Sequence, residues 1–359
     1  SGCQKALQNI VVRWKKMARI AINGLGRIGK LVTRLLLDLQ DDSPENPIEL
    51  VLINEPVGRI EQHALWLEFD TVHGKWTADI KINAECFCVN GREIRRSQEF
   101  DQTKIGLNNE KIDVVIDCTG KFKTEADFEP YFEQGVRKVL VSAPVKEGQA
   151  LNVVYGINHT DYLPSQHNII TAASCTTNCL APIVKVIHEE IGIKHGSITT
   201  LHNVTNTQEI EDKPATETRR ARSALNSLIP TTTGSATAIS LIYPELKGRL
   251  NGHAVRVPIL NASITDCVFE VVRETTVEEV NRYLKSWSLG KLNGILGYET
   301  RSLVSADYVN DTRSAIIDAP STMVTNNTQV KLYAWYDNEF GYACRVVDIL
   351  RYLCKQDWH

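Results

Sequence analysis

The sequence predicts a two-domain protein, in which an α/β domain with a parallel sheet is followed by an α+β domain with a mostly antiparallel sheet. The first observation is the length of 359 residues, which exceeds the size at which a single hydrophobic core usually stops growing. The second is that short apolar runs alternate with helical stretches in the first half, as in βαβ units. The third is a change near residue 170, after which the apolar runs are longer and alternate with polar residues.

The apolar runs of the first half are short and nearly continuous, which is typical of strands buried on both faces of a parallel sheet. A helical stretch over Gly29–Leu39 separates the first run from the second. The strands are expected at Arg19–Asn23, Ile48–Asn54, Ile112–Cys118 and Lys138–Ser142. We therefore expect a first domain over residues 17–174, preceded by a leader or tag over residues 1–16.

The second half predicts strands that have one buried face, because apolar and polar residues alternate along them. These strands are expected at Ser197–His202, His253–Pro258, Asp266–Val272 and Val330–Tyr336. An amphipathic helix is expected at Val277–Ser288, and a closing helix at Val346–Leu353. We expect this second domain to span residues 175–341 and the C-terminal helix, residues 342–356, to pack on the first domain.

The composition excludes several classes of protein. Hydrophobic residues make up 43% and charged residues 23% of the chain, as in an ordinary globular protein. The net charge of −3 and the absence of a long apolar run predict neither a nucleic-acid partner nor a membrane partner. The nine cysteines are odd in number and scattered, which favours a reducing compartment, hence a cytoplasmic location. No metal site is expected, because neither C-x-x-C nor H-E-x-x-H occurs.

Gly24, Gly26 and Gly29 form a G-x-G-x-x-G motif that follows the first predicted strand and opens a helix. The first glycine permits a tight turn, the second lets the backbone approach a pyrophosphate, and the third lets helix and strand pack closely. The helix N-terminus also offers unpaired N–H groups to phosphate oxygens. In this context the motif favours a Rossmann dinucleotide-binding domain over a simple strand–helix turn.

Other polar residues follow the predicted strands at the edge where such folds bind ligands. Glu55 ends the second strand, where a carboxylate binds the adenosine ribose hydroxyls and repels a 2′-phosphate, so NAD is predicted over NADP. Its distance from the glycines is longer than usual, which we attribute to a polar loop before the strand. Thr119, Gly120 and Ser142 follow two further strands at the same edge.

The tract AASCTTNCLAP predicts a reactive thiol. Ser174 can cap a helix that begins at Cys175, where the helix dipole favours the thiolate. Pro182 conflicts with a continuous helix, so we expect a kink or a late start. Cys179 lies one turn after Cys175 and has the simpler interpretation of a buried packing residue. His202 ends a predicted strand and is one of several histidines that could serve as the base.

The motifs NGLGRIG, SAPVK, ASCTTNCLAP, PTTTGSATA, RVP and WYDNEFGY occur in this order, and together they resemble phosphorylating glyceraldehyde-3-phosphate dehydrogenase. The resemblance extends over residues 17–353. It implies that Cys175 attacks the aldehyde, that His202 accepts the hydroxyl proton, and that NAD takes up a hydride. The resulting thioester would then be cleaved by inorganic phosphate to an acyl phosphate.

The resemblance also assigns binding residues and an assembly. Arg27 and Ile28 would meet the pyrophosphate by their backbone, and Asn338 would hold the nicotinamide carboxamide. The substrate phosphate would lie at Thr205, Thr207 and Arg256, whereas the attacking phosphate would lie at Ser174, Thr176, Arg220, Thr233 and Gly234. Hydroxyls, a glycine N–H and arginine side chains are suitable donors for such anions. The segment Asn203–Asn226 matches a loop that reaches a neighbouring subunit, which implies a homotetramer.

Three alternatives stay open at this point. The Asn54-Glu55 step also occurs in erythrose-4-phosphate dehydrogenases. Other stretches are similar to the enzymes associated with arsenical efflux, in which arsenate replaces phosphate. A non-catalytic NAD-binding interaction protein is the alternative from another class, although the nucleophile, the base and both anion sites are all present in the sequence.

Overall fold

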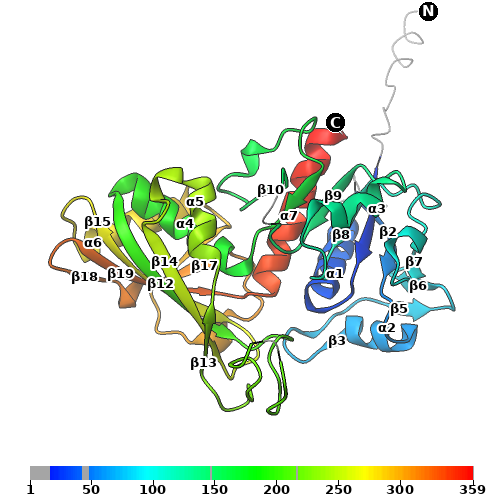
Figure 1. Ribbon diagram of the computed structural model, residues 1–359, viewed down its shortest axis with the longest axis horizontal. Helices are drawn as coiled ribbons and strands as arrows, with labels where there is room; N and C mark the ends of the chain where they lie inside the picture. Colours follow the sequence, from blue (N-terminus) through cyan, green and yellow to red (C-terminus); the bar gives the residue numbers. More distant parts are fainter. Residues whose placement is uncertain (1–16, 43–47, 146–147, 216, 359) are drawn as a thin grey trace, which may run out of the picture.

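Two sheets with surrounding helices make up the computed structural model, which describes residues 17–42, 48–145, 148–215 and 217–358 (Figure 1). The first sheet lies on one side of the molecule and the second on the other, with α7 between them (Figure 1). The predicted fold class is confirmed, since an α/β half is followed by a half with a mixed, mostly antiparallel sheet. The expected leader or tag lies outside the described residues.

Within the described residues, the first sheet has nine strands in the order β10-β11-β9-β8-β1-β2-β7-β6-β5. Neighbours from β10 to β7 are parallel, and β7, β6 and β5 are antiparallel to one another. The strands in this order are Leu151–Asn152, Ile169–Thr171, Lys138–Val141, Val114–Asp117, Ala18–Asn23, Ile48–Asn54, Arg92–Ser97, Cys86–Val89 and Ile80–Ile82. The four predicted strands are therefore confirmed as the adjacent, parallel centre of the sheet, whereas the antiparallel edge was not predicted.

Helices cover both faces of the first sheet and bury its side chains. They are α1 (Arg27–Asp42), α2 (Ile60–Glu68), α3 (Glu129–Phe132) and α7 (Phe340–Asp357). One core lies between the sheet and the pair α1 and α7, and contains Ile20, Leu36 and Leu350. A second core on the other face contains Val115, Phe128 and Tyr131. The short pair β3 (Phe69–Asp70) and β4 (Gly74–Lys75) follows α2.

Among the described residues, the second sheet has eight strands in the order β13-β14-β12-β15-β19-β17-β16, with β18 paired to β19. Only β12–β14 and β16–β17 pair in parallel, so the predicted mostly antiparallel sheet is confirmed. The strands are β12 (Ile193–Asn203), β13 (Ile229–Thr232), β14 (Leu250–Val257), β15 (Ser263–Val271), β16 (Leu296–Glu299), β17 (Ala315–Asp318), β18 (Met323–Thr325) and β19 (Gln329–Tyr336). Three helices accompany this sheet: α4 (Cys175–Glu190), α5 (Ser235–Ile242) and α6 (Val277–Leu289).

Helix α4 corrects one prediction. It begins at Cys175 and runs past Pro182 to Glu190, so the expected late start is wrong. Pro182 removes one backbone hydrogen bond, but the helix is surrounded by buried apolar side chains such as Ile183 and Ile187. Packing of this kind outweighs the local cost of the proline, because most helical stability in proteins comes from tertiary contacts.

Among the described residues, none of the helices combines the length and the hydropathy that a membrane span requires, and no group of three or more His, Cys, Asp and Glu side chains could hold a metal ion. The domain limits expected at residues 174 and 175 stay a prediction.

Candidate active site

The turn between β11 and α4 places Cys175 at the first position of the helix. Ala173 has a positive φ of 52°, which is uncommon for a residue with a side chain. The hydroxyl of Tyr342 donates to the Ala173 carbonyl at 3.0 Å, and the Ala173 N–H donates to Thr171 Oγ1 at 3.1 Å. Ser174 then caps the helix by accepting from the Thr177 N–H at 3.1 Å, which confirms the predicted cap.

His202 lies opposite this thiol at the end of β12. The Cys175 Sγ and the His202 Nε2 are 3.6 Å apart, although the two residues come from different elements. His202 Nδ1 lies 2.8 Å from the Asn203 carbonyl and 2.5 Å from Arg256 Nη1. Donation from Nδ1 to that carbonyl leaves Nε2 free to accept the proton of the thiol. Arg256 competes for Nδ1, and an anion bound to Arg256 would relieve this competition.

Burial controls the protonation of the pair. It raises the pKa of the Cys175 thiol, and the Arg256 charge, the Thr176 hydroxyl and two backbone N–H groups lower it by less. The expected preference for thiolate is therefore outweighed, and the thiol is the form at neutral pH. Burial and the charge of Arg256 lower the pKa of His202 to about 4. His202 is thus neutral at pH 7 and can act as a base.

One tyrosine and two threonines complete the wall around the thiol. The hydroxyl of Tyr336 lies 2.8 Å from Thr200 Oγ1 and 3.1 Å from Thr176 Oγ1. Thr176 is buried, so its predicted contact with a phosphate depends on a hydroxyl that Tyr336 already engages. The N–H groups of Cys175 and Thr176 interact with the thiol sulfur, which places helix donors where negative charge develops.

Three of the predicted anion-binding residues, Arg220, Thr207 and Thr205, form one hydrogen-bonded group. Arg220 donates to Thr207 Oγ1 at 2.7 Å and to Thr231 Oγ1 at 3.0 Å, and Thr207 lies 3.0 Å from Thr205 Oγ1. Burial lowers the pKa of Arg256, and the positive charge of Arg220 lowers it further, so the two guanidinium groups are close enough to repel each other. The structure thus brings together residues that the sequence assigned to two separate anion sites. Thr231 was not predicted.

Other predicted anion ligands are engaged in local contacts. Thr233 Oγ1 lies 2.8 Å from Ser235 Oγ, and Gly234 precedes α5 with open space around its Cα. Ser174 Oγ is occupied by the helix cap and by Thr177 Oγ1 at 2.7 Å. The Nε of Arg256 is buried and has no acceptor among the described residues. An anion would satisfy this donor, so Arg256 fits the role that the sequence suggested.

The glycine turn has the shape of a dinucleotide cradle. Gly24 has a φ of 94°, and a Cβ there would lie 2.9 Å from the Thr119 N at the end of β8. A Cβ on Gly29 would lie 1.9 Å from the Gly24 carbonyl oxygen, so only glycine fits. Gly26 instead faces open space. The first and third glycines therefore serve packing, and the second leaves room for a pyrophosphate.

A cavity of about 290 Å³ opens beside this turn. Its lining residues are Leu25, Gly26, Arg27, Lys30, Glu55, Val57, His63, Trp66 and Asn206. Glu55 accepts from the Leu25 N–H at 2.8 Å and from the Val57 N–H at 3.1 Å, which fixes its carboxylate at the mouth of the cavity. A carboxylate in this place can accept from ribose hydroxyls as well. The described residues therefore fit NAD.

The remaining cofactor residues lie along the same edge of the first sheet. Ile28 stands in the first turn of α1, directly after Arg27. Thr119 and Gly120 follow β8, and Thr119 bonds to Asp117 through both its N–H and its hydroxyl. The Ser142 N–H donates to the Asp117 carbonyl at 2.9 Å. These turns are held at the carboxyl ends of neighbouring parallel strands, where such sheets bind ligands.

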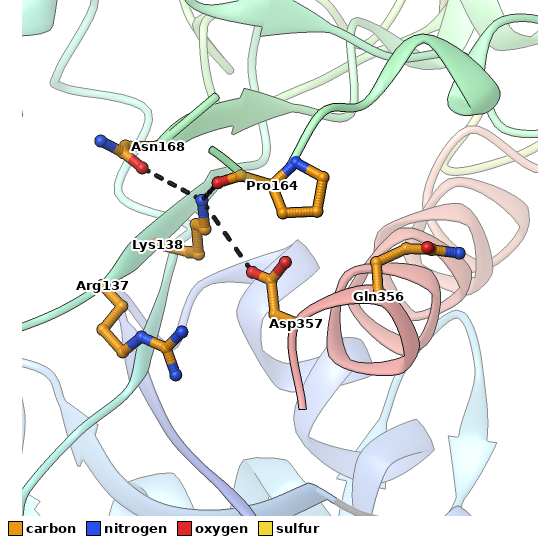
Figure 2. Close-up of a pocket in the computed structure, with 6 residues that line it drawn as sticks. All are labelled: Arg137, Lys138, Pro164, Asn168, Gln356 and Asp357. Carbon is orange, nitrogen blue, oxygen red and sulfur yellow. Dashed lines mark hydrogen bonds and ion pairs between the residues drawn. The ribbon is translucent and has the colours of Figure 1, made fainter. Parts of the chain in front are cut away.

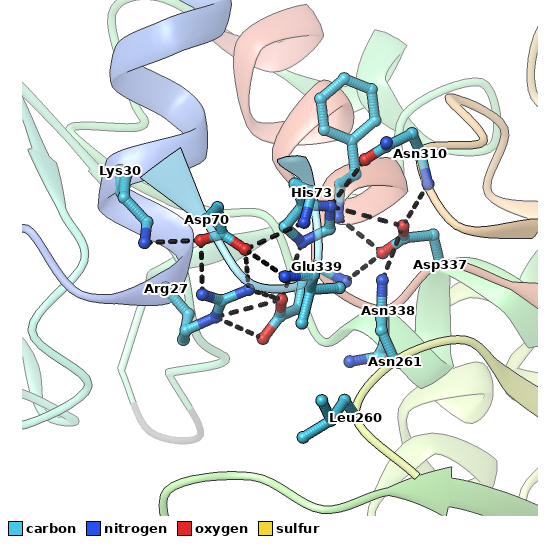
Figure 3. A network of polar contacts seen from close by, with 12 residues as sticks. Arg27, Lys30, Asp70, His73, Leu260, Asn261, Asn310, Asp337, Asn338 and Glu339 are labelled. Carbon is cyan, nitrogen blue, oxygen red and sulfur yellow. Dashed lines mark hydrogen bonds and ion pairs between the residues drawn. The ribbon is translucent and has the colours of Figure 1, made fainter. Parts of the chain in front are cut away.

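Asn338 stands in the turn between β19 and α7 (Figure 3). Its Oδ1 accepts from the Ser263 hydroxyl at 2.9 Å, and the residue is buried. Ser263, Tyr336, Tyr342 and Glu339 support the site but were missed in the sequence. Three of them, Tyr336, Glu339 and Tyr342, lie in the WYDNEFGY motif, from which the sequence analysis selected only Asn338.

A second cavity, of about 390 Å³, lies elsewhere, between β9 and the C-terminal end of α7 (Figure 2). The Lys138 Nζ donates there to the carbonyls of Pro164 and His167 and to Asn168 Oδ1. These contacts use all three protons of the ammonium group. This lysine is therefore a structural group, and the cavity shares no lining residue with the candidate site.

Comparisons with known proteins agree with these features. The model of the glyceraldehyde 3-phosphate dehydrogenase NAD binding domain matches residues 18–125, and the model of the C-terminal domain of the same enzyme matches residues 174–338. Glyceraldehyde-3-phosphate dehydrogenase 3 of Nostoc sp. is 56% identical over 93% of this chain and 97% of its own length. The Geobacillus stearothermophilus glyceraldehyde-3-phosphate dehydrogenase is 45% identical over 94% of this chain and 98% of its own length.

Proposed function

The chain belongs to the NAD-dependent glyceraldehyde-3-phosphate dehydrogenase family, and we propose that it oxidises glyceraldehyde 3-phosphate through a thioester on Cys175. The observation that carries this proposal is the pair of Cys175 Sγ and His202 Nε2, 3.6 Å apart at the start of α4. A thiol, a neutral imidazole and helix N–H groups are the three parts that nucleophilic attack on an aldehyde requires.

The reaction begins when the sulfur of Cys175 forms a bond to the aldehyde carbon. The thiol proton moves through His202 Nε2 to the new alkoxide, which gives a hemithioacetal. His202 then accepts the proton of this hydroxyl, so the carbon is free to lose a hydride and become a thioester. NAD, when bound, supplies the hydride acceptor. A phosphate oxygen finally attacks the thioester carbon, and the sulfur leaves as thiolate.

The anion region supports two binding roles in this sequence. Arg256 has an unsatisfied buried Nε beside His202, which supports a contact with the substrate phosphate. Arg220, Thr207 and Thr231 form a second set of donors nearby. We assign the attacking anion to inorganic phosphate, which arsenate matches in charge and nearly in shape. The relatives are named glyceraldehyde-3-phosphate dehydrogenase, which does not favour the alternatives of an erythrose-4-phosphate dehydrogenase or a non-catalytic protein.

Steady-state kinetics test the proposal. NADH formation is measured with glyceraldehyde 3-phosphate or erythrose 4-phosphate, each with phosphate, arsenate or neither. We expect sustained turnover only with glyceraldehyde 3-phosphate and an oxyanion, and a lower kcat/KM with arsenate than with phosphate. A higher kcat/KM with arsenate than with phosphate would identify arsenate as the attacking anion. A rate without any oxyanion that equals the rate with phosphate would exclude cleavage of a thioester by phosphate.

We further propose a cytoplasmic homotetramer in which residues 17–174 form the NAD-binding domain, residues 175–341 form the catalytic domain, and residues 342–356 pack on the former. Large apolar side chains support the assembly, because Ile210, Leu225 and Leu228 are each about two-thirds exposed on the segment between β12 and β13. Sedimentation velocity of the protein checks this. A monomeric species at micromolar concentration would rule the tetramer out.

A further inference from the structure

A buried polar network joins the glycine turn to the turn that carries Asn338 (Figure 3). Arg27, at the start of α1, is its central residue. It donates to Asp70 at 2.6 and 3.1 Å through its two terminal nitrogens. It also donates to Glu339 through Nη2 at 2.5 Å and through Nε at 3.0 Å. Both carboxylates therefore hold the guanidinium in a fixed orientation.

Further residues lock these carboxylates in place. Lys30 Nζ lies 2.6 Å from Asp70 Oδ2, and His73 Nε2 lies 2.8 Å from Glu339 Oε2. The side chains of Asp70, His73 and Glu339 are 0%, 1% and 13% exposed, whereas Arg27 is 30% exposed on the side that lines the cavity. Buried charges with complete partners resist displacement, because a shift would leave a charge uncompensated.

The network touches both places where the proposed function puts NAD. Arg27 directly follows Gly26, which faces the open pyrophosphate space. Glu339 directly follows Asn338, the proposed ligand of the nicotinamide carboxamide. Asp337 secures the same turn, because its Oδ1 accepts from the N–H groups of Glu339 and Phe340 at 2.9 and 2.8 Å. The ion pair between Arg27 and Glu339 therefore links the glycine turn directly to the turn that carries Asn338.

We propose that Glu339 is a positioning residue that, through Arg27, sets the distance between the pyrophosphate turn and Asn338. This inference rests on the proposed function. A dinucleotide must be held at both ends, and the second contact forms easily only when its partner is already at the right distance. Glu339 touches neither end of the cofactor in this scheme, and it acts by holding two turns that do.

The test compares NAD with ADP-ribose, which lacks the nicotinamide ring. ADP-ribose reaches the glycine turn and Glu55 but cannot reach Asn338, so its binding does not depend on the spacing. The variant Glu339→Gln keeps the size of the side chain but removes the charge and places an NH₂ donor against the donors Arg27 and His73. Calorimetric titration of the purified protein gives both dissociation constants without turnover.

We expect Glu339→Gln to weaken NAD binding by about 10-fold or more and ADP-ribose binding by less than about twofold. The matched control is Glu279→Gln, which removes the carboxylate of an exposed ion pair with Arg273 outside the network, and it should change neither constant. Equal losses for the two ligands, or no loss for either, would overturn the proposal.

A second variant decides the matter if Glu339→Gln does not fold. His73→Asn leaves the ion pair of Arg27 and Glu339 intact but removes the other partner of Glu339. This variant should weaken NAD binding less than Glu339→Gln does, but still more than it weakens ADP-ribose binding. An unchanged ratio of the two dissociation constants would contradict the inference. Because wild-type turnover with glyceraldehyde 3-phosphate is measured separately, failure of the proposed reaction and failure of this inference give different results.

Discussion

The reactive thiol owes its properties to burial and to two neighbours, His202 and Arg256, rather than to its position on the helix alone. Burial holds Cys175 as a thiol and keeps His202 neutral, and Arg256 acts on both in the same sense by lowering each pKa. Burial thus favours the neutral forms of both groups, whose Sγ and Nε2 atoms lie 3.6 Å apart. The nucleophile is produced when the proton moves from the half-buried thiol to the buried imidazole.

Replacement of either partner should separate their roles. Cys175→Ser should lower kcat for NADH formation by more than about 10³-fold, because the hydroxyl is a far weaker nucleophile. His202→Asn should lower kcat by about 10²–10⁴-fold, since proton transfer is lost and the thiol remains. Stopped-flow measurement of the first turnover checks both. A Cys175→Ser protein that retained sustained NADH formation would disprove the thioester route.

The raised thiol pKa also predicts the pH dependence of alkylation. Only the thiolate reacts with iodoacetamide, so the rate constant for Cys175 should rise about 10-fold per pH unit from pH 7 to 9. Arg256→Gln should slow the reaction at every pH, because it removes the charge that lowers the pKa of the thiol. Mass spectrometry of the labelled peptide, with Cys175→Ser as the control, gives the rates. A plateau below pH 8 would contradict the raised pKa.

At the scale of elements, the start of α4 depends on a turn that a regular backbone would not form. Ala173 adopts a left-handed conformation between β11 and the helix, and Tyr342 reaches over from α7 to hold its carbonyl. Such strain persists only where the surroundings enforce it. The contacts from Thr171 and Tyr342 thus decide the direction in which Cys175 projects.

Substitutions at Ala173 and at its neighbour Ala172 should differ. Ala173→Gly should change the free energy of unfolding by less than about 0.5 kcal/mol, because glycine is unstrained at positive φ. Ala172→Gly, at a buried position with an ordinary φ, should cost about 0.5–1 kcal/mol. Ala173→Val should cost about 1–3 kcal/mol, since a branched side chain disfavours this conformation. Urea denaturation gives the three values, and an equal cost for both glycine variants would argue against strain.

Strong local signals explain which elements could be predicted from the sequence. Residue type alone predicts the short apolar strands β1, β2, β8 and β9. It also predicts the start of α4, because serine is a favoured N-cap residue at position 174. The edge strands β5, β6 and β7 are half exposed and mix charged with apolar residues, which leaves no clear period. Pro182 made a late start one of two expectations, and that expectation is wrong because tertiary packing, which a local rule does not contain, holds the helix together.

The candidate site was predictable in its residue types but not in its geometry. Sequence spacing left His202 as one of several histidines, and the fold brings it to Cys175 across 27 positions. The contact of Arg220 with Thr207 depends on the path of a long loop, which no motif describes. Glu339 was passed over because its role depends on Asp70 and His73, which lie far away in the sequence.

For the whole molecule, the buried network contributes to stability as well as to position. Burial lowers the pKa of His73, but the hydrogen bond to Glu339 and nearby charges raise it by more, above its ordinary 6.5. Burial raises the pKa of Glu339, but His73 and Arg27 lower it by more, below its ordinary 4.5. The stability that protonated His73 adds to the fold is complete below pH 6.5 and is lost as the pH rises through the pKa of the folded state. The stability that ionised Glu339 adds is complete above pH 4.5 and is lost as the pH falls through its folded-state pKa.

The pair should therefore stabilise the fold most between about pH 4.5 and 6.5. His73→Gln should lower the free energy of unfolding by about 1–3 kcal/mol near pH 5.5 and by less at pH 8.5. Thermal and urea denaturation over this range, with the exposed His195→Gln as the control, tests the window. An equal loss at the two pH values would show that His73 acts only as a neutral hydrogen-bonding group.

The packing of α7 on α1 has a consequence for biosynthesis. The core beside the first sheet includes Val346, Leu350 and Leu353, which leave the ribosome after the whole second sheet has been made. Domains usually fold in order as the chain emerges, but the first half here cannot close its core until the last helix arrives. The growing chain must therefore carry an incomplete apolar face through most of translation, and chaperones that bind such faces would meet it there.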